Sequence, residues 1–189
     1  MGSMIHWPLL LPFALRRPVL LLRDLLVDRR RPDLERLALI QEPELFVWEI
    51  LPHAARTFSA CIILLPSGMA LPSAVAYLYC RILDSYEDLL PDAGDRDKAL
   101  ASFVERLEAA DSDALPGPAS AIDPALARDA RDLGHVLLVN RCSMVDRVFI
   151  TLDAEVRRSI VDLVREMSQG MRWWSETFER QGGCLSDSR

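Results

Sequence analysis

The chain has 189 residues, a length that fits one domain with a single sizeable core or a large part of such a domain. Half of the residues are hydrophobic and 26% are charged, a composition that excludes a disordered chain and favours an all-helical globule. The net charge of −6 argues against a general nucleic-acid-binding protein. The four cysteines lie far apart without a CxxC pair, which predicts reduced thiols and a cytoplasmic protein.

Residues 1–32 form an apolar and basic N-terminal segment, distinct in composition from residues 33–189. Prolines and arginines interrupt every apolar run, so no run approaches the roughly 20 residues that cross a bilayer. The segment fits a helix that packs on its own domain, and this interpretation is favoured. The alternative is peripheral contact with an anionic membrane through the apolar residues and the arginines at 29–31.

From Asp33 onward the pattern predicts successive helices, and no strand-like alternation extends beyond a few residues. Pro52 is expected to end the first helix, and Asp95 to cap the fourth. A loop rich in proline and serine, at 111–124, is expected before the last two helices. The predicted helices cover residues 43–51, 56–65, 71–89, 95–110, 124–149 and 153–182.

The predicted helix at 71–89 carries a row of polar side chains. Tyr77, Arg81, Asp84 and Asp88 follow offsets of four, three and four residues, which places them on one face. Most neighbouring residues are apolar, so the helix is expected to be buried with this row facing a polar cavity.

Three carboxylates, those of Asp84, Glu87 and Asp88, crowd the end of this helix. The negative end of the helix dipole disfavours anions there, and a divalent cation would relieve the repulsion. Oxygen ligands favour Mg²⁺, which bridges carboxylates to phosphates, and Arg81 can bind the same diphosphate. The spacing alone leaves open a solvated helix end in which Arg81 pairs locally with a carboxylate.

Two segments carry a resemblance to a known family. The sequence ARTF at 55–58, followed by AYLYCRILDSYEDLLPD at 76–92, resembles the N-terminal signature of squalene and phytoene synthases. The segment MSQGM at 167–171 is similar to the family's MxxGM helix segment, where a small residue lets the isoprenoid chain pass. The resemblance covers about residues 51–183 and implies an all-α, isoprenoid-synthase-type helical bundle.

The resemblance implies a Mg²⁺-dependent transferase that joins two prenyl diphosphates, farnesyl or geranylgeranyl, head to head. It assigns metal binding to Asp84 and Asp88, with Glu87 beside them, and diphosphate binding to Arg56 and Arg81. Tyr77, together with Arg81, matches the catalytic positions.

Two departures from the family pattern stand out. Ala55 replaces the usual serine before Arg56, and the family's second aspartate-rich motif has no counterpart after MSQGM. We therefore expect a bundle that is incomplete at its C-terminus, with a second subunit that completes the active site or a longer parent protein. The alternative function is a truncated or degenerate member that binds prenyl diphosphate or a partner subunit without turnover. A relative of the cyclising terpene synthases fits less well because those proteins typically lack ARTF.

Several other residues are predicted to have structural roles or are assigned no role. Asp129 and Asp132 alternate with arginines at 128 and 131 and are predicted to form a salt-bridged solvent face. His53 and His135 are assigned no role. Trp173 and Trp174 are expected to pack in the core or against further segments.

Overall fold

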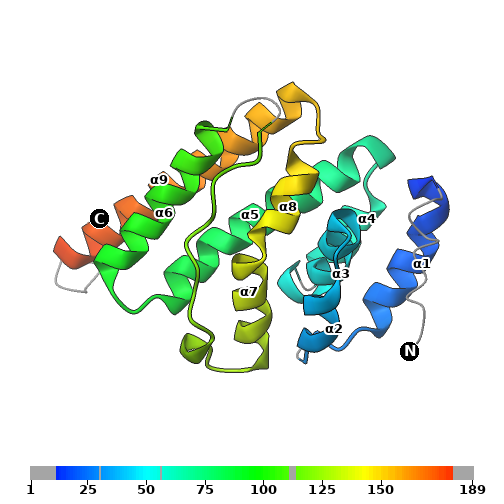
Figure 1. Cartoon of the computed structure of the whole chain (residues 1–189), viewed down its shortest axis with the longest axis horizontal. Helices are drawn as coiled ribbons and strands as arrows, with labels where there is room; N and C mark the ends of the chain where they lie inside the picture. The colour runs from blue at the N-terminus through cyan, green and yellow to red at the C-terminus, as the bar shows by residue number, and fades with distance from the viewer. Residues whose placement is uncertain (1–11, 30, 56, 111–113, 181–189) are drawn as a thin grey trace, which may run out of the picture.

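The computed structural model describes residues 12–29, 31–55, 57–110 and 114–180 (Figure 1). Within these ranges the regular structure consists of α-helices and one short 3₁₀ helix, without a strand. This confirms the all-α prediction. The helices occur in the predicted order along the chain, although several of them begin or end at other residues than predicted.

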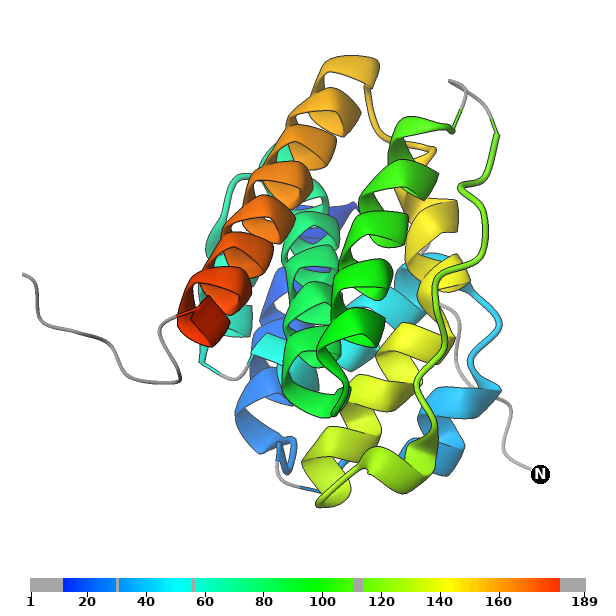
Figure 2. The same ribbon diagram turned by 90° about the vertical axis from the view of Figure 1, so that its left-hand side faces the viewer.

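Helix α5 (Ser67–Leu89) is the central element of the bundle. Six helices contact it: α3 (Pro43–Ala55), α4 (Phe58–Leu64), α6 (Ala93–Glu108), α7 (Ala130–Asn140), α8 (Cys142–Phe149) and α9 (Ala154–Arg180). Figure 2 shows α9, α5 and α6 side by side, with α7 and α8 on the other side of α6 in that view. The residues of α5 are thus enclosed along most of the helix and reach the surface in its first turn and near its end.

Two further helices precede α3 in the chain. Helix α1 (Phe13–Leu26) packs on α4, and α2 (Leu34–Leu39) packs on α7 and α3. None of the described helices combines the length and apolar character needed to span a membrane.

The prediction that Pro52 ends a helix is wrong, because α3 continues through it to Ala55. A proline inside a helix removes the hydrogen bond to the carbonyl four residues earlier, here that of Trp48. The guanidinium of Arg23 donates a hydrogen bond to this carbonyl oxygen. A tertiary contact therefore satisfies the group that the proline leaves free, and the helix persists.

Two further helix boundaries differ from the prediction. Helix α5 begins at Ser67, so that Pro72 lies inside the helix. Helix α6 is capped by Asp92, whose carboxylate accepts a hydrogen bond from the backbone nitrogen of Asp95 at 3.0 Å. Asp95 is therefore a first-turn residue and the predicted cap lies three positions too late.

The single helix predicted over 124–149 is three elements. Asp123 caps a 3₁₀ helix (Pro124–Leu126), and Asp129 caps α7 by accepting hydrogen bonds from two backbone nitrogens. At Arg141 the backbone leaves the helical region, and α8 starts anew. The side chain of Arg141 donates to the backbone carbonyls of residues 37, 38 and 40, which ties this break to the end of α2.

The core beneath α5 contains a buried ion pair. Arg106 on α6 and Asp146 on α8 lie 3.0 Å apart, and both are almost fully buried. The Tyr79 hydroxyl donates to the same carboxylate at 2.8 Å, and the Arg106 guanidinium lies 4.2 Å from the centre of the Phe103 ring. This network joins α5, α6 and α8 behind the face that carries the candidate site.

Candidate active site

Three members of the polar row on α5, Tyr77, Arg81 and Asp84, are in direct contact. The Arg81 guanidinium donates to the Tyr77 hydroxyl at 3.4 Å and lies 3.2 Å from the Asp84 carboxylate. These contacts confirm that the three side chains share one face of the helix. Arg81 is held between a phenol and a carboxylate, so its charge is oriented before any ligand binds.

The three carboxylates differ in burial. Asp84 is half-buried, with 30% of its side chain exposed, whereas Glu87 and Asp88 are exposed. The expectation that the row of Tyr77, Arg81, Asp84 and Asp88 lies on a buried helix is therefore wrong at Asp88, and Glu87 beside it is exposed as well. The end of α5 reaches the edge of the bundle, and only the turn that carries Asp84 is still covered by neighbouring helices.

Electrostatics in the carboxylate row favour a positive partner. Burial raises the pKa of Asp84, nearby Arg81 opposes that rise, and the charge of Asp88 adds to it. Burial also raises the pKa of Glu87, and the charges of Asp88 and Asp84 add to the increase. The carboxylates thus repel one another, and a cation bound between them would remove that repulsion.

The donor set fits Mg²⁺ if water and phosphate supply the remaining ligands. Among the described residues, no group of three histidine, cysteine or acidic side chains comes together as a closed metal site. Mg²⁺ commonly binds through one or two carboxylates and keeps several waters or phosphate oxygens. Asp84 and Asp88, one turn apart, would supply the carboxylates, with Glu87 beside them.

An apolar cavity of about 340 Å³ lies beside the upstream part of the row. Tyr77 and Cys80 of α5 form one wall, and the Tyr77 ring stacks on Phe58 with 5.6 Å between centroids. The remaining lining comes from α4, α5, α9 and the α4–α5 connection: Cys61, Ile62, Leu65, Ser73, Ala76 and Leu163. The surface along α5 therefore changes from apolar at Tyr77 to charged at Asp84, over about 10 Å of helix.

Helix α7 brings further polar groups to the charged end, which the sequence did not predict. Burial lowers the pKa of His135 to about 4, and the nearby charge of Arg81 contributes to that shift. Asp88 also lies within electrostatic range of His135 and of Arg128. No spacing rule connects residues 40 positions or more apart in the chain, so only the packing of α7 on α5 reveals these neighbours.

The solvent face predicted on α7 is confirmed in part. Asp132 pairs with Arg128 at 2.8 Å, as expected. Asp132 is nevertheless buried, because it also accepts the backbone N–H of Arg128 and sits under the turn before α7. This corrects the description of Asp132 as solvated.

The low pKa of His135 predicts a loss of stability in acid. Because the folded-state pKa of about 4 lies below the unfolded value of 6.5, the unfolded state binds the proton more readily. This contribution is complete above pH 6.5 and is lost as the pH falls towards 4. We expect it to amount to roughly 3 kcal/mol, and His135→Gln to remove it.

Urea unfolding at pH 7.0 and pH 4.5 measures this contribution. The free energy of unfolding of His135→Gln should fall less between the two pH values than that of the wild type, by roughly 2 to 3 kcal/mol. Equal losses in both proteins would contradict a partly buried His135 that stays neutral in the folded protein.

The other residues of the family signature lie away from the polar row or outside the described residues. Arg56 lies outside the described residues, so its predicted contact with diphosphate stays a prediction. Gly170 of MSQGM is exposed on α9, and a β-carbon added there would meet nothing within 4 Å. Trp173 and Trp174 are 58% and 53% exposed, so the first of the two expectations, packing in the core, is wrong. The second, packing against further segments, stays a prediction.

Taken together, an all-α bundle and an amphiphilic site on its central helix define a protein of the isoprenoid-synthase fold class. The squalene/phytoene synthase family model matches residues 51–181, about two thirds of the chain. The chain belongs to the squalene/phytoene synthase family. Comparison with curated proteins and with solved structures gives no match.

Proposed function

We propose that the chain binds the diphosphate and the first part of the isoprenoid chain of a prenyl diphosphate, for head-to-head prenyl transfer. One observation carries this proposal: the apolar cavity is lined by Tyr77, and the hydroxyl of Tyr77 contacts Arg81 of the Arg81–Asp84 pair one turn further along α5. A prenyl diphosphate has the same order of polarity, an apolar chain followed by a multiply charged headgroup.

Each described residue has a defined task in this proposal. The Arg81 guanidinium binds a phosphate oxygen, and its contact with Tyr77 keeps it directed along the helix face. Asp84 and Asp88, with Glu87, would hold Mg²⁺, which when bound neutralises charge on the departing diphosphate. The cavity walls exclude water from the allylic carbon, where positive charge develops as the diphosphate leaves.

Titration of the full chain with farnesyl thiodiphosphate, an unreactive analogue, tests the binding step. Binding that requires Mg²⁺ and disappears with a chelator supports the proposal, since the carboxylates should repel the analogue without the metal. Absence of binding in the presence of Mg²⁺ would remove the proposal.

A second candidate is a family member that binds prenyl diphosphate, or a partner subunit, without turnover. Several large apolar side chains of α4, α5 and α9, two of which (Phe58 and Leu163) line the cavity, are exposed, a feature typical of a surface covered by another segment: Phe58, Leu64, Met69, Leu163, Trp173 and Trp174. Incubation with farnesyl or geranylgeranyl diphosphate separates the candidates. Release of inorganic diphosphate supports a transferase, whereas Mg²⁺-dependent binding without release supports the second candidate.

A further inference from the structure

Two half-buried arginines beside the charged end of α5 lack a partner. Neither the guanidinium of Arg96 on α6 nor that of Arg131 on α7 makes a hydrogen bond or an ion pair with another described residue. Every other half-buried arginine in the described part of the chain makes at least one such contact. A guanidinium that has lost part of its hydration gains most from an anionic partner, so both positions favour a bound anion.

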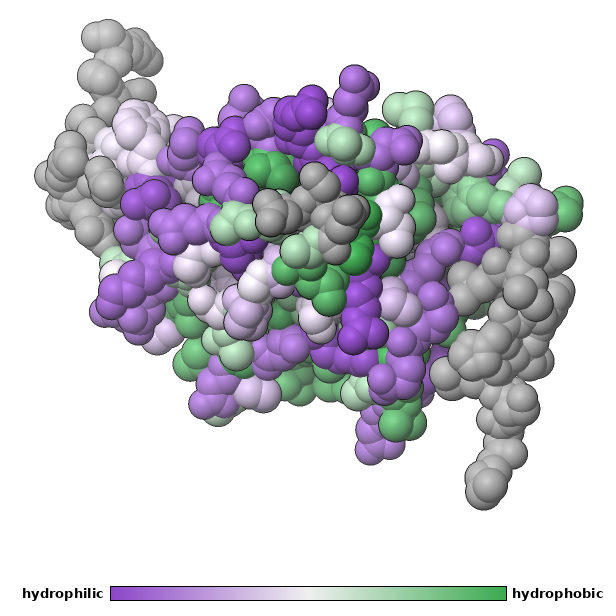
Figure 3. Space-filling view, turned by 45° about the horizontal axis from the view of Figure 1, so that its top comes forward, coloured by the Kyte–Doolittle hydropathy of each residue, from purple (hydrophilic) through white to green (hydrophobic). Residues whose placement is uncertain are grey.

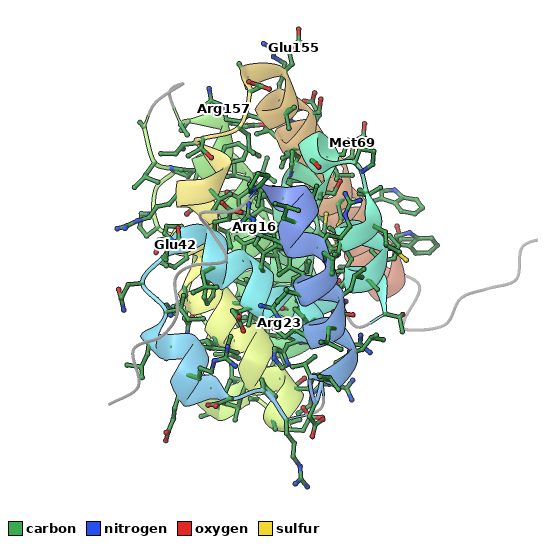
Figure 4. All side chains as sticks on the ribbon, turned by 90° about the vertical axis from the view of Figure 1, so that its right-hand side faces the viewer. Arg16, Arg23, Glu42, Met69, Glu155 and Arg157 are labelled. Atoms are coloured by element: carbon green, nitrogen blue, oxygen red, sulfur yellow. The ribbon has the colours of Figure 1, made fainter. Side chains whose placement is uncertain are left out.

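Arginines at the opposite end of the molecule are paired. Figure 4 labels Arg16 and Arg23 on α1. Arg16 lies 2.7 Å from Glu44, and Arg23 lies 2.5 Å from Glu49. Exposed charges need no such partner because water solvates them, and Figure 3 shows hydrophilic side chains spread over one face of the protein.

The three carboxylates of α5 face two different neighbouring helices. At about 100° per residue, Glu87 lies about 60° to one side of Asp84 and Asp88 about 40° to the other side. Arg96 is an electrostatic neighbour of Glu87, so α6 flanks the first side. His135 is an electrostatic neighbour of Asp88, so α7 flanks the second side.

Arg131 belongs to the second side through His135. The two residues lie one turn apart on α7, and the charge of Arg131 reaches the imidazole, as does the charge of Arg81 on α5. The end of α5 and the starts of α6 and α7 lie at the same end of the bundle (Figures 1 and 2). Arg96 and Arg131 therefore approach the carboxylates from opposite sides of α5.

The two arginines improve the charge balance of the site when a diphosphate is bound. The carboxylates of Asp84, Glu87 and Asp88 are joined by about three negative charges on the diphosphate. One Mg²⁺ and Arg81 offset only about half of this total. Arg96 and Arg131 would reduce the remaining excess to about one negative charge, and a guanidinium can donate two parallel hydrogen bonds to phosphate.

We propose that Arg96 of α6 and Arg131 of α7 bind the headgroup of a prenyl diphosphate from the two sides of the carboxylate row. This inference rests on the proposed function and adds two ligands from outside α5 to the headgroup site. The headgroup is then held by three helices, with Mg²⁺ and Arg81 on α5 and one guanidinium on each neighbouring helix.

Calorimetric titration of the full chain in the presence of Mg²⁺ tests this inference with two probes, farnesyl thiodiphosphate and inorganic pyrophosphate. Arg96→Gln combined with Arg131→Gln should raise the dissociation constant of both probes at least about tenfold, because charge-assisted hydrogen bonds to phosphate are lost. Arg96→Lys combined with Arg131→Lys keeps both charges and should lose less affinity.

A charge-matched variant controls for the net charge of the protein. Arg147→Gln combined with Arg158→Gln removes two exposed arginines, one on α8 and one on α9, and should bind both probes as the wild type does. The Arg96 and Arg131 glutamine variant should keep the urea midpoint of the wild type, since neither guanidinium has an ion pair to lose among the described residues.

The possible outcomes distinguish this inference from the proposed function. Equal affinity of the wild type and the Arg96 and Arg131 glutamine variant for the analogue would overturn the inference and leave the proposed function in place. An equal loss in the Arg147 and Arg158 variant would also overturn it. Arginine-dependent binding of pyrophosphate, with no gain from the farnesyl group, would support the two phosphate ligands and remove the proposed function. Absence of binding of either probe would remove both.

Discussion

Replacing Asp84 with asparagine is expected to lower Mg²⁺-dependent diphosphate release at least about 100-fold. Asp84 is the half-buried member of the three carboxylates, and it also holds Arg81 at 3.2 Å. The substitution therefore removes a metal ligand and frees the guanidinium that should bind the diphosphate. If the protein binds without turnover, the same variant should lose its Mg²⁺-dependent affinity for farnesyl thiodiphosphate.

Stability distinguishes a functional effect of this substitution from a structural one. Because the pKa of Asp84 is raised in the folded protein, its ionised form opposes folding at neutral pH. The asparagine variant should thus unfold at the same urea concentration as the wild type or a slightly higher one. Asp95→Asn, an exposed carboxylate on α6, is the matched control and should leave both release and stability unchanged. Normal release by Asp84→Asn would contradict the assigned role.

The largest loss of stability is expected from Asp146→Ala. The substitution leaves the Arg106 guanidinium charged and unpaired inside the core, and removes the acceptor of the Tyr79 hydroxyl. Breaking a buried ion pair on one side costs about 3 to 5 kcal/mol, a large share of the roughly 5 to 15 kcal/mol that stabilises a domain. Chemical unfolding of the purified chain measures the change.

Two comparisons make this prediction specific. Asp162→Ala breaks an exposed ion pair with Arg165 and should cost less than about 1 kcal/mol. Replacing the buried pair on both sides, as Arg106→Met with Asp146→Leu, should recover much of the lost stability because no charge remains unpaired. A cost for Asp146→Ala no larger than that for Asp162→Ala would contradict the importance of the buried pair.

Much of the candidate site was predictable because it lies on one helix. Offsets of three and four residues place Tyr77, Arg81 and Asp84 on one face of any α-helix, and their contacts confirm it. The same offsets hold at Asp88, but they carry no information on where the neighbouring helices stop. Glu87 and Asp88 are exposed because the neighbouring helices stop before the last turn of α5. The prediction of a buried row therefore failed at this turn.

Helix ends were predicted less well than helix faces. Pro52 would end an isolated helix, but Arg23 satisfies the Trp48 carbonyl from another element. Asp92 and Asp95 are equally good capping residues in the sequence, and only the backbone geometry before α6 selects Asp92. A tertiary contact decides the first of these helix ends and the path of the backbone decides the second, and a local sequence pattern contains neither.

The sequence by itself determined the helical class, the shared face of Tyr77, Arg81 and Asp84 on α5, and the family, because these depend on local periodicity and on short motifs. Only the tertiary structure decided that His135 lies near Arg81, that Arg106 and Asp146 pair in the core, and that α1 turns its leucines outward. Each of these features joins residues far apart in the chain or depends on which face of a helix is covered. Packing fixes such relations, and a pattern read along one helix leaves them open.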